Sequence, residues 1–497
     1  MKRLFLLNFM DLIALLAGIA TVFAFAPFAY YWLALLTPAL LLMTWLNVSA
    51  KRALWRGFLF GLGLFGVGTS WLYVSVHYFG NLNILVAGLI TVLFIFTLAL
   101  FPALQGYFVN KLWPTTNPYK LLLVFPASWV LFEWLRELFL TGFPWLFLGV
   151  SQINGPLAGF APLVGTFGTS FLVVFCAGLL TCFITYPNWR RYFAILGILI
   201  LLGAGLLLYR IDWTHPKGAP ITVSLVQGNI AQELKWNSDW VIANIERYQQ
   251  LTKHHWHSQL ILWPENAIPI PLPDASDITT ELNAQALAHH STLMTGIPIL
   301  VDPDRSTYYN SLIALGTSQG EYDKRHLVPF GEYIPLINTF QNLLNFLRLP
   351  MSSFISGPQH QSLLLINHKI PVATFICYEI AYSRLIDQDL PQAQLLITIS
   401  DDAWFGHSFA AWQHLQIGQM QALSTGRELL FSTNNGMTAI VNSHGKIIKI
   451  APAFKPFVLT GQIQPTIGTT PWVFFDNWPI ICLMFILLVI AFLRRKQ

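Results

Sequence analysis

Eight apolar stretches, each close to the length that a lipid bilayer demands, constrain the fold of this chain more than any other feature. A helix that crosses the hydrocarbon core of a membrane needs roughly 20 apolar residues. Stretches of that kind occupy residues 5–25, 30–46, 57–78, 84–107, 121–138, 160–185, 192–209 and 477–493. The composition agrees, because 55% of the residues are hydrophobic and only 10% are charged. We therefore expect a polytopic membrane protein with a soluble part.

The positions of the basic residues predict how these helices are oriented. Lys and Arg gather at one set of helix ends, namely Lys2–Arg3, Lys51–Arg56, Lys111–Lys120, Arg190–Arg191 and Arg494–Lys496. The intervening loops near 26–29, 79–83 and 139–159 contain almost none. Because cytoplasmic loops carry the excess of Lys and Arg, both termini are expected in the cytoplasm. The long segment 213–475 then lies on the other side, which is the periplasm if the membrane is a bacterial inner membrane.

This pattern predicts three domains. A transmembrane domain of seven helices spans residues 1–212, a soluble domain spans 213–475, and a C-terminal transmembrane helix spans 476–497. The formal net charge of +5 is modest, and the basic residues sit at the ends of apolar stretches, so we expect no nucleic-acid partner.

Short β-branched runs alternate with helical stretches in the soluble segment. The predicted strands are 221–228, 259–265, 291–299, 310–316, 372–379, 395–402, 429–436 and 438–445. Helical spacing is found at 238–256, 278–290 and 409–426. Several of these strands are apolar throughout, as in a sheet that is covered on both faces. The sequence therefore predicts an α/β domain in addition to the membrane helices.

Polar side chains follow several of the predicted strands. They are Gln227 and Asn229, Glu265 and Asn266, Cys377 to Glu379, Ser400 to Asp402, and Asn434 with Asn435. Strand ends are where α/β folds build their active sites. Cys377 is also the only cysteine of the soluble segment, since the other three lie in apolar stretches. With no soluble partner for a disulfide, its thiol is either inert core or a nucleophile.

Three segments favour the nucleophile: WPENAIP (263–269), DKRHLVPFGEYIP (323–335) and ICYEI (376–380). They supply a carboxylate, an amine and a thiol, which are the groups that acyl transfer requires. Cys377 would attack an ester or amide, and Glu265 would act as the base that takes its proton. Lys324 would face the oxyanion of the tetrahedral intermediate, and its charge would also favour the thiolate.

These segments resemble the nitrilase superfamily, whose Glu–Lys–Cys triad occurs in this order with similar separations. Together with the predicted spans, the chain resembles the apolipoprotein N-acyltransferase family, a membrane-embedded branch of that superfamily. The similar stretches include TGFPWL (141–146), VQGNIAQELKW (226–236), MSSFISGP (351–358), SDDAWFG (400–406), WQHLQ (412–416), STNNG (432–436) and NWP (477–479). Asp401 departs from the pattern, because Asn is expected at that position.

The resemblance implies a nitrilase-like α-β-β-α sandwich inserted between seven N-terminal helices and one C-terminal helix. It also implies an acyltransferase of the bacterial inner membrane, with its catalytic domain in the periplasm. The acyl donor would be the sn-1 ester of a phospholipid, with phosphatidylethanolamine preferred. The acceptor would be the free α-amine of the N-terminal diacylglyceryl-cysteine of an apolipoprotein. Cys377 would carry the acyl group as a thioester, and no cofactor or metal is expected.

Further residues are assigned through the same resemblance. Glu332 would hold Lys324 or take part in proton transfer, and Tyr378 and Glu379 would support the nucleophile. The backbone N–H of Tyr378 would donate to the oxyanion.

Four residues are expected to bind substrate. Trp236 and Asn310 would line the site, while Arg136 and Trp145 would meet a phosphate headgroup and acyl chains at the outer membrane surface. Two other interpretations stay open. Trp145 could be an interfacial anchor, and Arg136 could pair with Glu133 or Glu137.

Histidines give no sign of a metal site. His254, His255 and His257 do not share one face of a helix, and His414 is expected to be core or surface.

Two other functions fit parts of the sequence. A membrane-tethered carbon–nitrogen hydrolase would use water as acceptor and a small amide as substrate. A transporter or receptor would only bind its ligand, but the spans contain few of the charges that transport pathways carry.

Overall fold

The computed structural model describes residues 8–80, 82–186, 190–304, 306–329, 331–333 and 354–495. Residues 2, 3 and 496 of the basic clusters, and residues 351–353 of the MSSFISGP motif, lie outside this description. The chain divides into two compact units. One comprises Met1–Tyr73, Asn83–Ile211 and Phe474–Gln497, and the other comprises Val74–Leu82 and Asp212–Val473.

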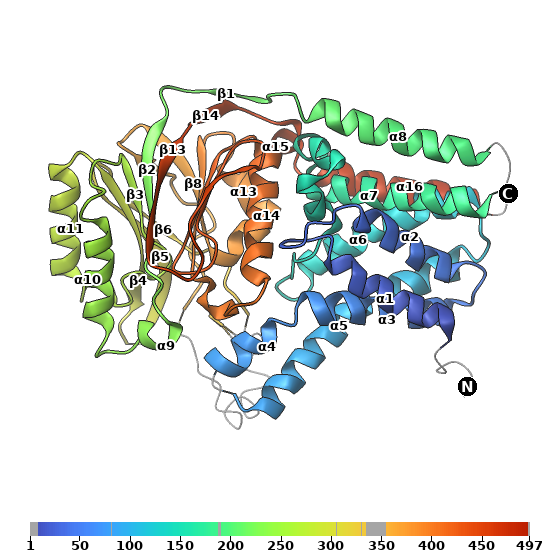
Figure 1. The fold of residues 1–497 in the computed structure, drawn as a ribbon, viewed down its shortest axis with the longest axis horizontal. Helices are drawn as coiled ribbons and strands as arrows, with labels where there is room; N and C mark the ends of the chain where they lie inside the picture. The colour runs from blue at the N-terminus through green and yellow to red at the C-terminus, as the bar shows by residue number, and fades with distance from the viewer. Residues whose placement is uncertain are drawn as a thin grey trace. The chain divides into compact units, whose positions relative to one another are not determined.

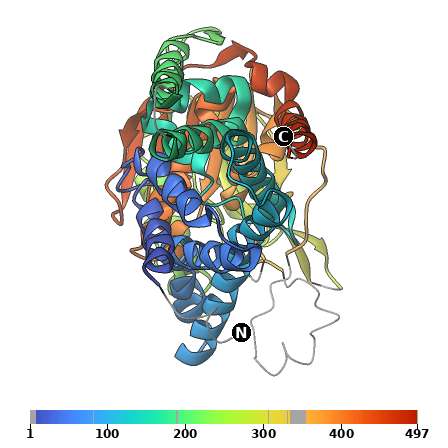
Figure 2. The same cartoon turned by 90° about the vertical axis from the view of Figure 1, so that its right-hand side faces the viewer.

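The first unit is helical (Figure 1). Its α-helices are α1 (Phe9–Val22), α2 (Leu33–Trp45), α3 (Ala50–Gly68), α5 (Ile84–Leu112), α6 (Phe125–Leu138), α7 (Ala161–Thr185), α8 (Arg190–Leu208) and α16 (Trp478–Leu493). Shorter turns are η2 (Lys120–Val124), η3 (Leu148–Asn154) and η4 (Pro156–Phe160), while α4 (Leu72–Val74) continues into the second unit. Figure 2 shows the helices of this unit side by side after a 90° turn.

By length and composition, three of the described helices could cross a membrane: Ile84–Leu112, Pro156–Thr185 and Arg191–Leu208. Ala50–Gly68 and Leu72–Phe79 would make a fourth span, bent by 57°. Three shorter apolar helices are Phe9–Val22, Leu33–Trp45 and Trp478–Leu493. These helices correspond in place to predicted spans, and the total of seven plus one stays a prediction.

Polar side chains define several helix ends in this unit. Asn8 and Asp11 form a reciprocal capping box at the start of α1, which satisfies backbone N–H groups that the helix leaves open. Buried Asp11 also forms ion pairs with Arg52 and Arg56 of α3, the latter at 3.0 Å. The buried charge that the sequence placed in the first span is therefore neutralised within the helical unit.

The second unit contains all the strands of the described residues (Figure 1). They are β1 (Thr214–Pro216), β2 (Ile221–Gln227), β3 (Leu260–Leu262), β4 (Thr292–Asp302), β5 (Thr307–Gly316), β6 (Gly320–Asp323), β7 (Leu364–Ile366), β8 (Ile370–Ile376), β9 (Leu395–Ser400), β10 (Leu429–Thr433), β11 (Ala439–Val441), β12 (Ile447–Ile450), β13 (Phe457–Ile463) and β14 (Thr466–Gly468). Each of the eight predicted strands is confirmed, although every one differs from the prediction at one end or at both.

Helices of the second unit cover and connect these strands. They are η1 (Ser75–Phe79), α9 (Gln232–Lys235), α10 (Val241–Thr252), α11 (Ser276–Ala288), η5 (Cys377–Ala381), α13 (Ser383–Ile386), η6 (Asp387–Asp389), η7 (Asp402–Phe405), α14 (Ala410–Thr425) and α15 (Pro471–Phe475). The three predicted helices of the soluble segment are confirmed as α10, α11 and α14.

Two mixed six-stranded sheets organise the second unit. Their strand orders are β13-β2-β3-β4-β5-β6 and β12-β11-β10-β9-β8-β7. In each sheet three central strands are parallel, β2, β3 and β4 in the first and β8, β9 and β10 in the second. Because parallel strands share a direction, the segments that follow β3 and β8 leave their sheets at the carboxyl edge.

Alternate side chains of the first sheet enter two different cores. Leu262 of β3 belongs to a buried cluster that also contains Ile397 of β9, so this cluster takes side chains from both sheets. Its neighbour Ile261 belongs to a second cluster with Tyr248 of α10 and Leu282 of α11. Successive strand residues point to opposite faces, so both faces of this sheet are buried, as the apolar strands predicted.

Candidate active site

The three segments singled out in the sequence meet in the second unit. Glu265 lies just beyond β3, Lys324 directly follows β6, and Cys377 directly follows β8. Glu265 and Lys324 are buried, and Cys377 is partly exposed. Residues that come from separate strands are therefore brought together at strand ends, where the sequence predicted a site.

Glu265 and Lys324 form a buried ion pair. The Lys324 Nζ atom lies 3.3 Å from Glu265 Oε1. The other carboxylate oxygen, Oε2, accepts the backbone N–H of Asp401 at 2.9 Å. Burial alone would raise the pKa of the Glu265 carboxyl, but the charges of Lys324 and Lys235 outweigh it and hold that pKa below its ordinary value. Glu265 is therefore an ionised carboxylate at neutral pH.

Glu332 completes a second ion pair with the same lysine. Its carboxylate lies 2.9 Å from Lys324 Nζ, and one oxygen accepts the Val328 N–H at 2.8 Å. Burial would lower the pKa of the Lys324 ammonium, but Glu332 and Glu265 raise it well above its ordinary value. Lys324 therefore remains a cation throughout the physiological range.

Asn310 of β5 connects the two carboxylates. Its side-chain amide donates to Glu265 Oε1 at 2.8 Å and to Glu332 Oε1 at 2.7 Å. The sequence assigned Asn310 to the lining of the site. In the structure its amide spaces the two carboxylates around Lys324, so that both face one ammonium group.

Lys235 and Asp401 form another buried ion pair. Sequence reasoning named Asp401 among the polar residues at strand ends, but it did not assign Lys235 to the site. Lys235 Nζ bonds to Asp401 Oδ2 and donates to the backbone carbonyl of Glu265 at 2.8 Å. Asn434 donates to Asp401 Oδ1 at 3.0 Å. Asp401 is the position where the resembling motif has Asn, and here its carboxylate balances the charge of Lys235.

Cys377 has an unusual backbone conformation. Its φ of +56° lies in the left-handed region that non-glycine residues seldom adopt. Such strain is often found at functional sites, where the surrounding structure enforces it. Burial, followed by the charge of Glu265, raises the pKa of the Cys377 thiol well above its ordinary value, and the charge of Lys324 only partly opposes this shift. The charge of Lys324 therefore favours the thiolate, as the sequence analysis expected, but burial and Glu265 outweigh it, and the resting group is a neutral thiol.

Glu379 fixes the turn that carries Cys377. One of its oxygens accepts the Ile376 N–H at 2.8 Å and the Tyr322 hydroxyl at 2.9 Å. The other accepts the N–H groups of Arg325 at 2.6 Å and His326 at 3.0 Å. This carboxylate joins the end of β8 to the residues that follow Lys324, so the predicted supporting residue lies between two of the three segments.

His414 of α14 also reaches the nucleophile segment. Its Nε2 atom is 3.1 Å from the Cys377 carbonyl oxygen, and its Nδ1 atom is 3.1 Å from Asp402 Oδ1. His414 is 1% exposed, so of the two positions that the sequence left open, core and surface, the structure shows the core. Neither its contact with Cys377 nor its contact with Asp402 could be read from the sequence.

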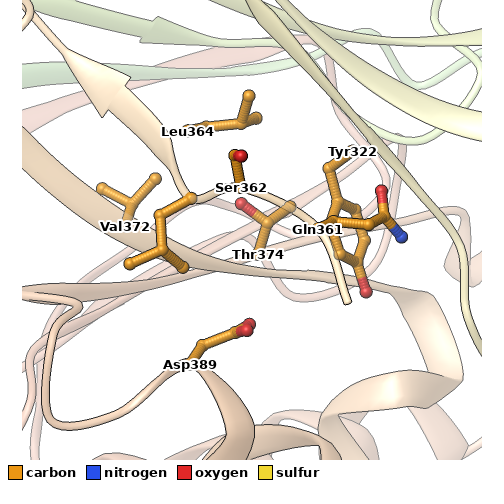
Figure 3. Close-up of a pocket in the computed structure, with 8 residues that line it drawn as sticks. Tyr322, Gln361, Ser362, Leu364, Val372, Thr374 and Asp389 are labelled. Atoms are coloured by element: carbon orange, nitrogen blue, oxygen red, sulfur yellow. The ribbon is translucent and has the colours of Figure 1, made fainter. Parts of the chain in front are cut away.

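A narrow hollow lies beside Tyr322, whose hydroxyl donates to Glu379 (Figure 3). Tyr322 and Asp389 line it, together with Leu364, Val372 and Thr374 of β7 and β8. Its lining includes none of the three candidate catalytic residues. The hollow is therefore separate from the chemistry at Cys377.

Sequence similarity to known proteins covers almost the whole chain. Residues 17–179 match the family model described as apolipoprotein N-acyltransferase N-terminal domain, and residues 222–471 match the model described as carbon-nitrogen hydrolase. The apolipoprotein N-acyltransferase of Coxiella burnetii is 43% identical and covers 97% of this chain and 100% of its own length. That of Methylococcus capsulatus is 41% identical and covers 98% of this chain and 96% of its own length.

The chain belongs to the apolipoprotein N-acyltransferase family. It is an acyltransferase whose second unit has a nitrilase-like carbon-nitrogen hydrolase fold. Among solved structures, a nitrilase superfamily protein of Saccharomyces cerevisiae covers 50% of this chain and 90% of its own. Its sequence identity is 17% and its TM-score is 0.38.

The other predicted substrate-binding residues of this acyltransferase lie in contrasting surroundings. Trp236, at the end of α9 in the second unit, is 46% exposed. In the helical unit Trp145 is 1% exposed, and Arg136 is 5% exposed. The Arg136 guanidinium donates to the Trp145 carbonyl and lies 4.7 Å from the centre of the Phe147 ring. Arg136 thus fixes the 143–147 loop.

Proposed function

We propose that this chain transfers an acyl group from the sn-1 ester of a phospholipid, preferably phosphatidylethanolamine, to a lipoprotein amine. The acceptor is the free α-amine of the N-terminal diacylglyceryl-cysteine of an apolipoprotein, and Cys377 carries the acyl group between the two substrates. The observation that carries this proposal is the buried Glu265–Lys324 ion pair, because the charges of both residues act on the Cys377 thiol, while Glu332 forms a further ion pair with Lys324. Family membership supplies the substrate class.

The first half-reaction forms a thioester. The Cys377 sulfur attacks the ester carbonyl carbon while its proton passes to Glu265. Negative charge develops on the carbonyl oxygen, where the Lys324 ammonium and the Tyr378 N–H stabilise it. As the tetrahedral intermediate collapses, the ester C–O bond breaks, and Glu265 returns the proton to the oxygen of the departing lysophospholipid.

The second half-reaction consumes the thioester. The lipoprotein amine attacks the thioester carbon, Glu265 accepts a proton from the amine nitrogen, and the oxyanion forms again. Collapse breaks the C–S bond, and the proton returns to the Cys377 sulfur. The product is an N-acylated lipoprotein, and the thiol and the carboxylate end in the states in which they began.

The protonation states of the free site support this cycle. A thiol with a raised pKa keeps its proton before the substrate arrives. A carboxylate with a lowered pKa is ionised at neutral pH, so it has a free oxygen that can accept a proton. Proton transfer therefore coincides with attack on the carbonyl. Glu332 keeps Lys324 charged and in place, which makes it a supporting residue.

We further propose the arrangement that the resemblance implies. The second unit is an α-β-β-α sandwich in the periplasm, placed between seven membrane helices and one C-terminal helix, with domains at 1–212, 213–475 and 476–497. The core cluster with side chains from both sheets supports the sandwich.

Two observations support the placement in a membrane. Large apolar side chains such as Leu85, Leu207 and Phe485 are 83%, 66% and 50% exposed, which suits lipid better than water. In Figure 1, α1 begins, α8 begins and α16 ends at the same end of the helical unit, as expected if both termini lie on one side.

Intact mass spectrometry tests the proposal directly. Purified protein is incubated with phosphatidylethanolamine alone, with wild type beside Cys377→Ala. We expect one added acyl mass on the wild type only, which hydroxylamine removes and a diacylglyceryl-cysteine peptide discharges. Discharge by water in place of the peptide would indicate a hydrolase. No adduct on the wild type would overturn the thioester mechanism.

A further inference from the structure

The contact between His414 and Cys377 involves the backbone and not the thiol. His414 Nε2 lies 3.1 Å from the carbonyl oxygen of Cys377, at the start of η5. On the other side of the ring, Nδ1 faces Asp402 Oδ1 at 3.1 Å, and the same oxygen accepts the Ser400 hydroxyl at 2.8 Å. Both ring nitrogens therefore have defined hydrogen-bond partners.

The chemistry of these partners determines where one proton lies. A carbonyl oxygen can only accept, so the hydrogen bond to Cys377 requires a proton on Nε2. A hydrogen bond between Nδ1 and Asp402 Oδ1 places its proton on one of these two atoms and leaves the proton on Nε2 in place. The Asp402–His414 pair thus presents the same N–H donor to Cys377 in either state.

The packing around His414 restricts its ring to one orientation. The ring is 1% exposed, and its centre lies 5.0 Å from that of Phe431 in an edge-to-face arrangement. Phe431 belongs to β10, while His414 belongs to α14. Because both are parts of regular elements, the donor is held by the core of the unit.

The bond that is fixed in this way is the peptide between Cys377 and Tyr378. It is not among the cis peptide bonds of the described residues, and in a trans peptide the C=O and the following N–H point in opposite directions. Fixing the Cys377 carbonyl therefore also fixes the direction of the Tyr378 N–H. A hydrogen bond to the carbonyl further polarises the N–H of the same peptide.

Resting on the proposed thioester chemistry, we propose that His414, held by Asp402, is a positioning residue for the oxyanion site. It aligns and polarises the Cys377–Tyr378 peptide, so that the Tyr378 N–H donates to the oxyanion beside Lys324. His414 does not remove the thiol proton, since its Nε2 atom is directed to the carbonyl, and that task remains with Glu265.

Two substitutions of His414 by amide side chains of different length test this role in the full-length protein. His414→Gln places an amide nitrogen near the position of Nε2, so it can still donate to the Cys377 carbonyl. His414→Asn places its amide near the position of Nδ1, too short to reach that oxygen. The exposed His254 provides a control for a His-to-Asn change outside the site, as His254→Asn.

Two reactions of Cys377 are then compared. Thioester formation from phosphatidylethanolamine passes through an oxyanion, whereas alkylation of the thiol by iodoacetamide does not. We expect His414→Asn to slow thioester formation by about 10²-fold, the usual effect of losing one oxyanion donor. Alkylation should stay within about threefold of wild type, and His414→Gln should recover most of the acylation rate.

Several results would overturn the inference. An acylation rate for His414→Asn equal to that of wild type and His254→Asn would show that the contact is irrelevant to the oxyanion. An equal loss of alkylation and acylation would show that His414 serves the thiol or the fold instead. A wild-type protein that forms no thioester would overturn the proposed function itself, which separates the two failures.

Discussion

At the level of single residues, the two groups that would exchange a proton have pKa values that are shifted in opposite directions. Lys324 and Lys235 hold the pKa of the Glu265 carboxyl below its ordinary value, despite burial that would raise it. Burial and the charge of Glu265 raise the pKa of the Cys377 thiol. Two titratable groups whose pKa values are pushed apart mark an acid and a base.

These shifts predict a broad pH profile for thioester formation. An ordinary Glu titrates near pH 4.3, and a lowered pKa means that Glu265 stays ionised as the pH falls to about 5. The rate should therefore change little between about pH 5 and pH 8, as measured by single-turnover acylation with phosphatidylethanolamine. Loss of half the rate near pH 6.5 would show that another group, such as a histidine, is the base.

Glu265→Gln separates the reactivity of the thiol from acyl transfer. Because the charge of Glu265 raises the pKa of Cys377, its removal should lower that pKa and shift iodoacetamide alkylation to lower pH. Thioester formation should fall by about 10²-fold or more, since the base is lost. An alkylation profile that does not move, or moves to higher pH, would contradict the electrostatic assignment.

At the level of elements, short hydrogen-bonded segments hold the site together. Glu379 ties the end of β8 to the residues after β6, with four donors on its two oxygens. Elsewhere in the second unit, Ser75 of η1 donates to the Trp404 carbonyl of η7 at 2.7 Å. The Phe79 ring lies 5.9 Å from that of Trp404. Ser75 and Phe79 of η1 thus hold η7, which begins at Asp402, in place.

Glu379→Gln should weaken the catalytic unit. The new amide nitrogen would replace an oxygen that accepts two N–H or O–H groups, and each hydrogen bond to a charged group contributes about 1.5–3 kcal/mol. A loss of about 3 kcal/mol lowers Tm by about 6 °C or more in a unit of this size. Thermal unfolding in detergent measures the change, with exposed Glu281→Gln as the control. An equal Tm for both variants would show that the two hydrogen bonds lost in Glu379→Gln add no stability.

Sequence reasoning missed the short strands β1, β6, β7, β12 and β14, and it also missed β13, which has seven residues. Strands of three or four residues, such as β6, β7 and β14, are too short to show alternation. The predicted strand 372–379 ends earlier, at Ile376, because the Glu379 side chain takes the Ile376 N–H and turns the chain. An apolar run contains no information about such a side-chain contact.

The same reasoning applies to the site. Glu265, Lys324 and Cys377 lie in distinctive motifs, and their convergence was therefore predictable. Lys235 and Asp401 are 166 residues apart, and His414 is 37 residues from Cys377, so only the fold shows that they touch. Their roles depend on long-range packing, which local residue patterns do not encode.

At the level of the whole molecule, the proposed chemistry requires that the soluble unit and the lipid substrates share one side of the membrane. The positive-inside pattern predicts that segment 213–475 lies outside the cytoplasm and that the loop between α5 and η2 lies inside. Both sides offer an exposed residue for a chemical label, Lys217 in the soluble unit and Thr115 in the loop. Topology can therefore be measured without relying on activity.

Cysteine labelling makes this prediction specific. In a chain whose four native cysteines are replaced by alanine, Lys217→Cys and Thr115→Cys are introduced separately, and intact spheroplasts are treated with a membrane-impermeant maleimide. Lys217→Cys should be labelled in intact spheroplasts, whereas Thr115→Cys should be labelled only after the membrane is permeabilised. Equal labelling of both in intact spheroplasts, or labelling of Thr115→Cys alone, would contradict the proposed orientation. If Thr115→Cys alone were labelled, the thiol of Cys377 would face the cytoplasm, away from any lipoprotein acceptor in the periplasm.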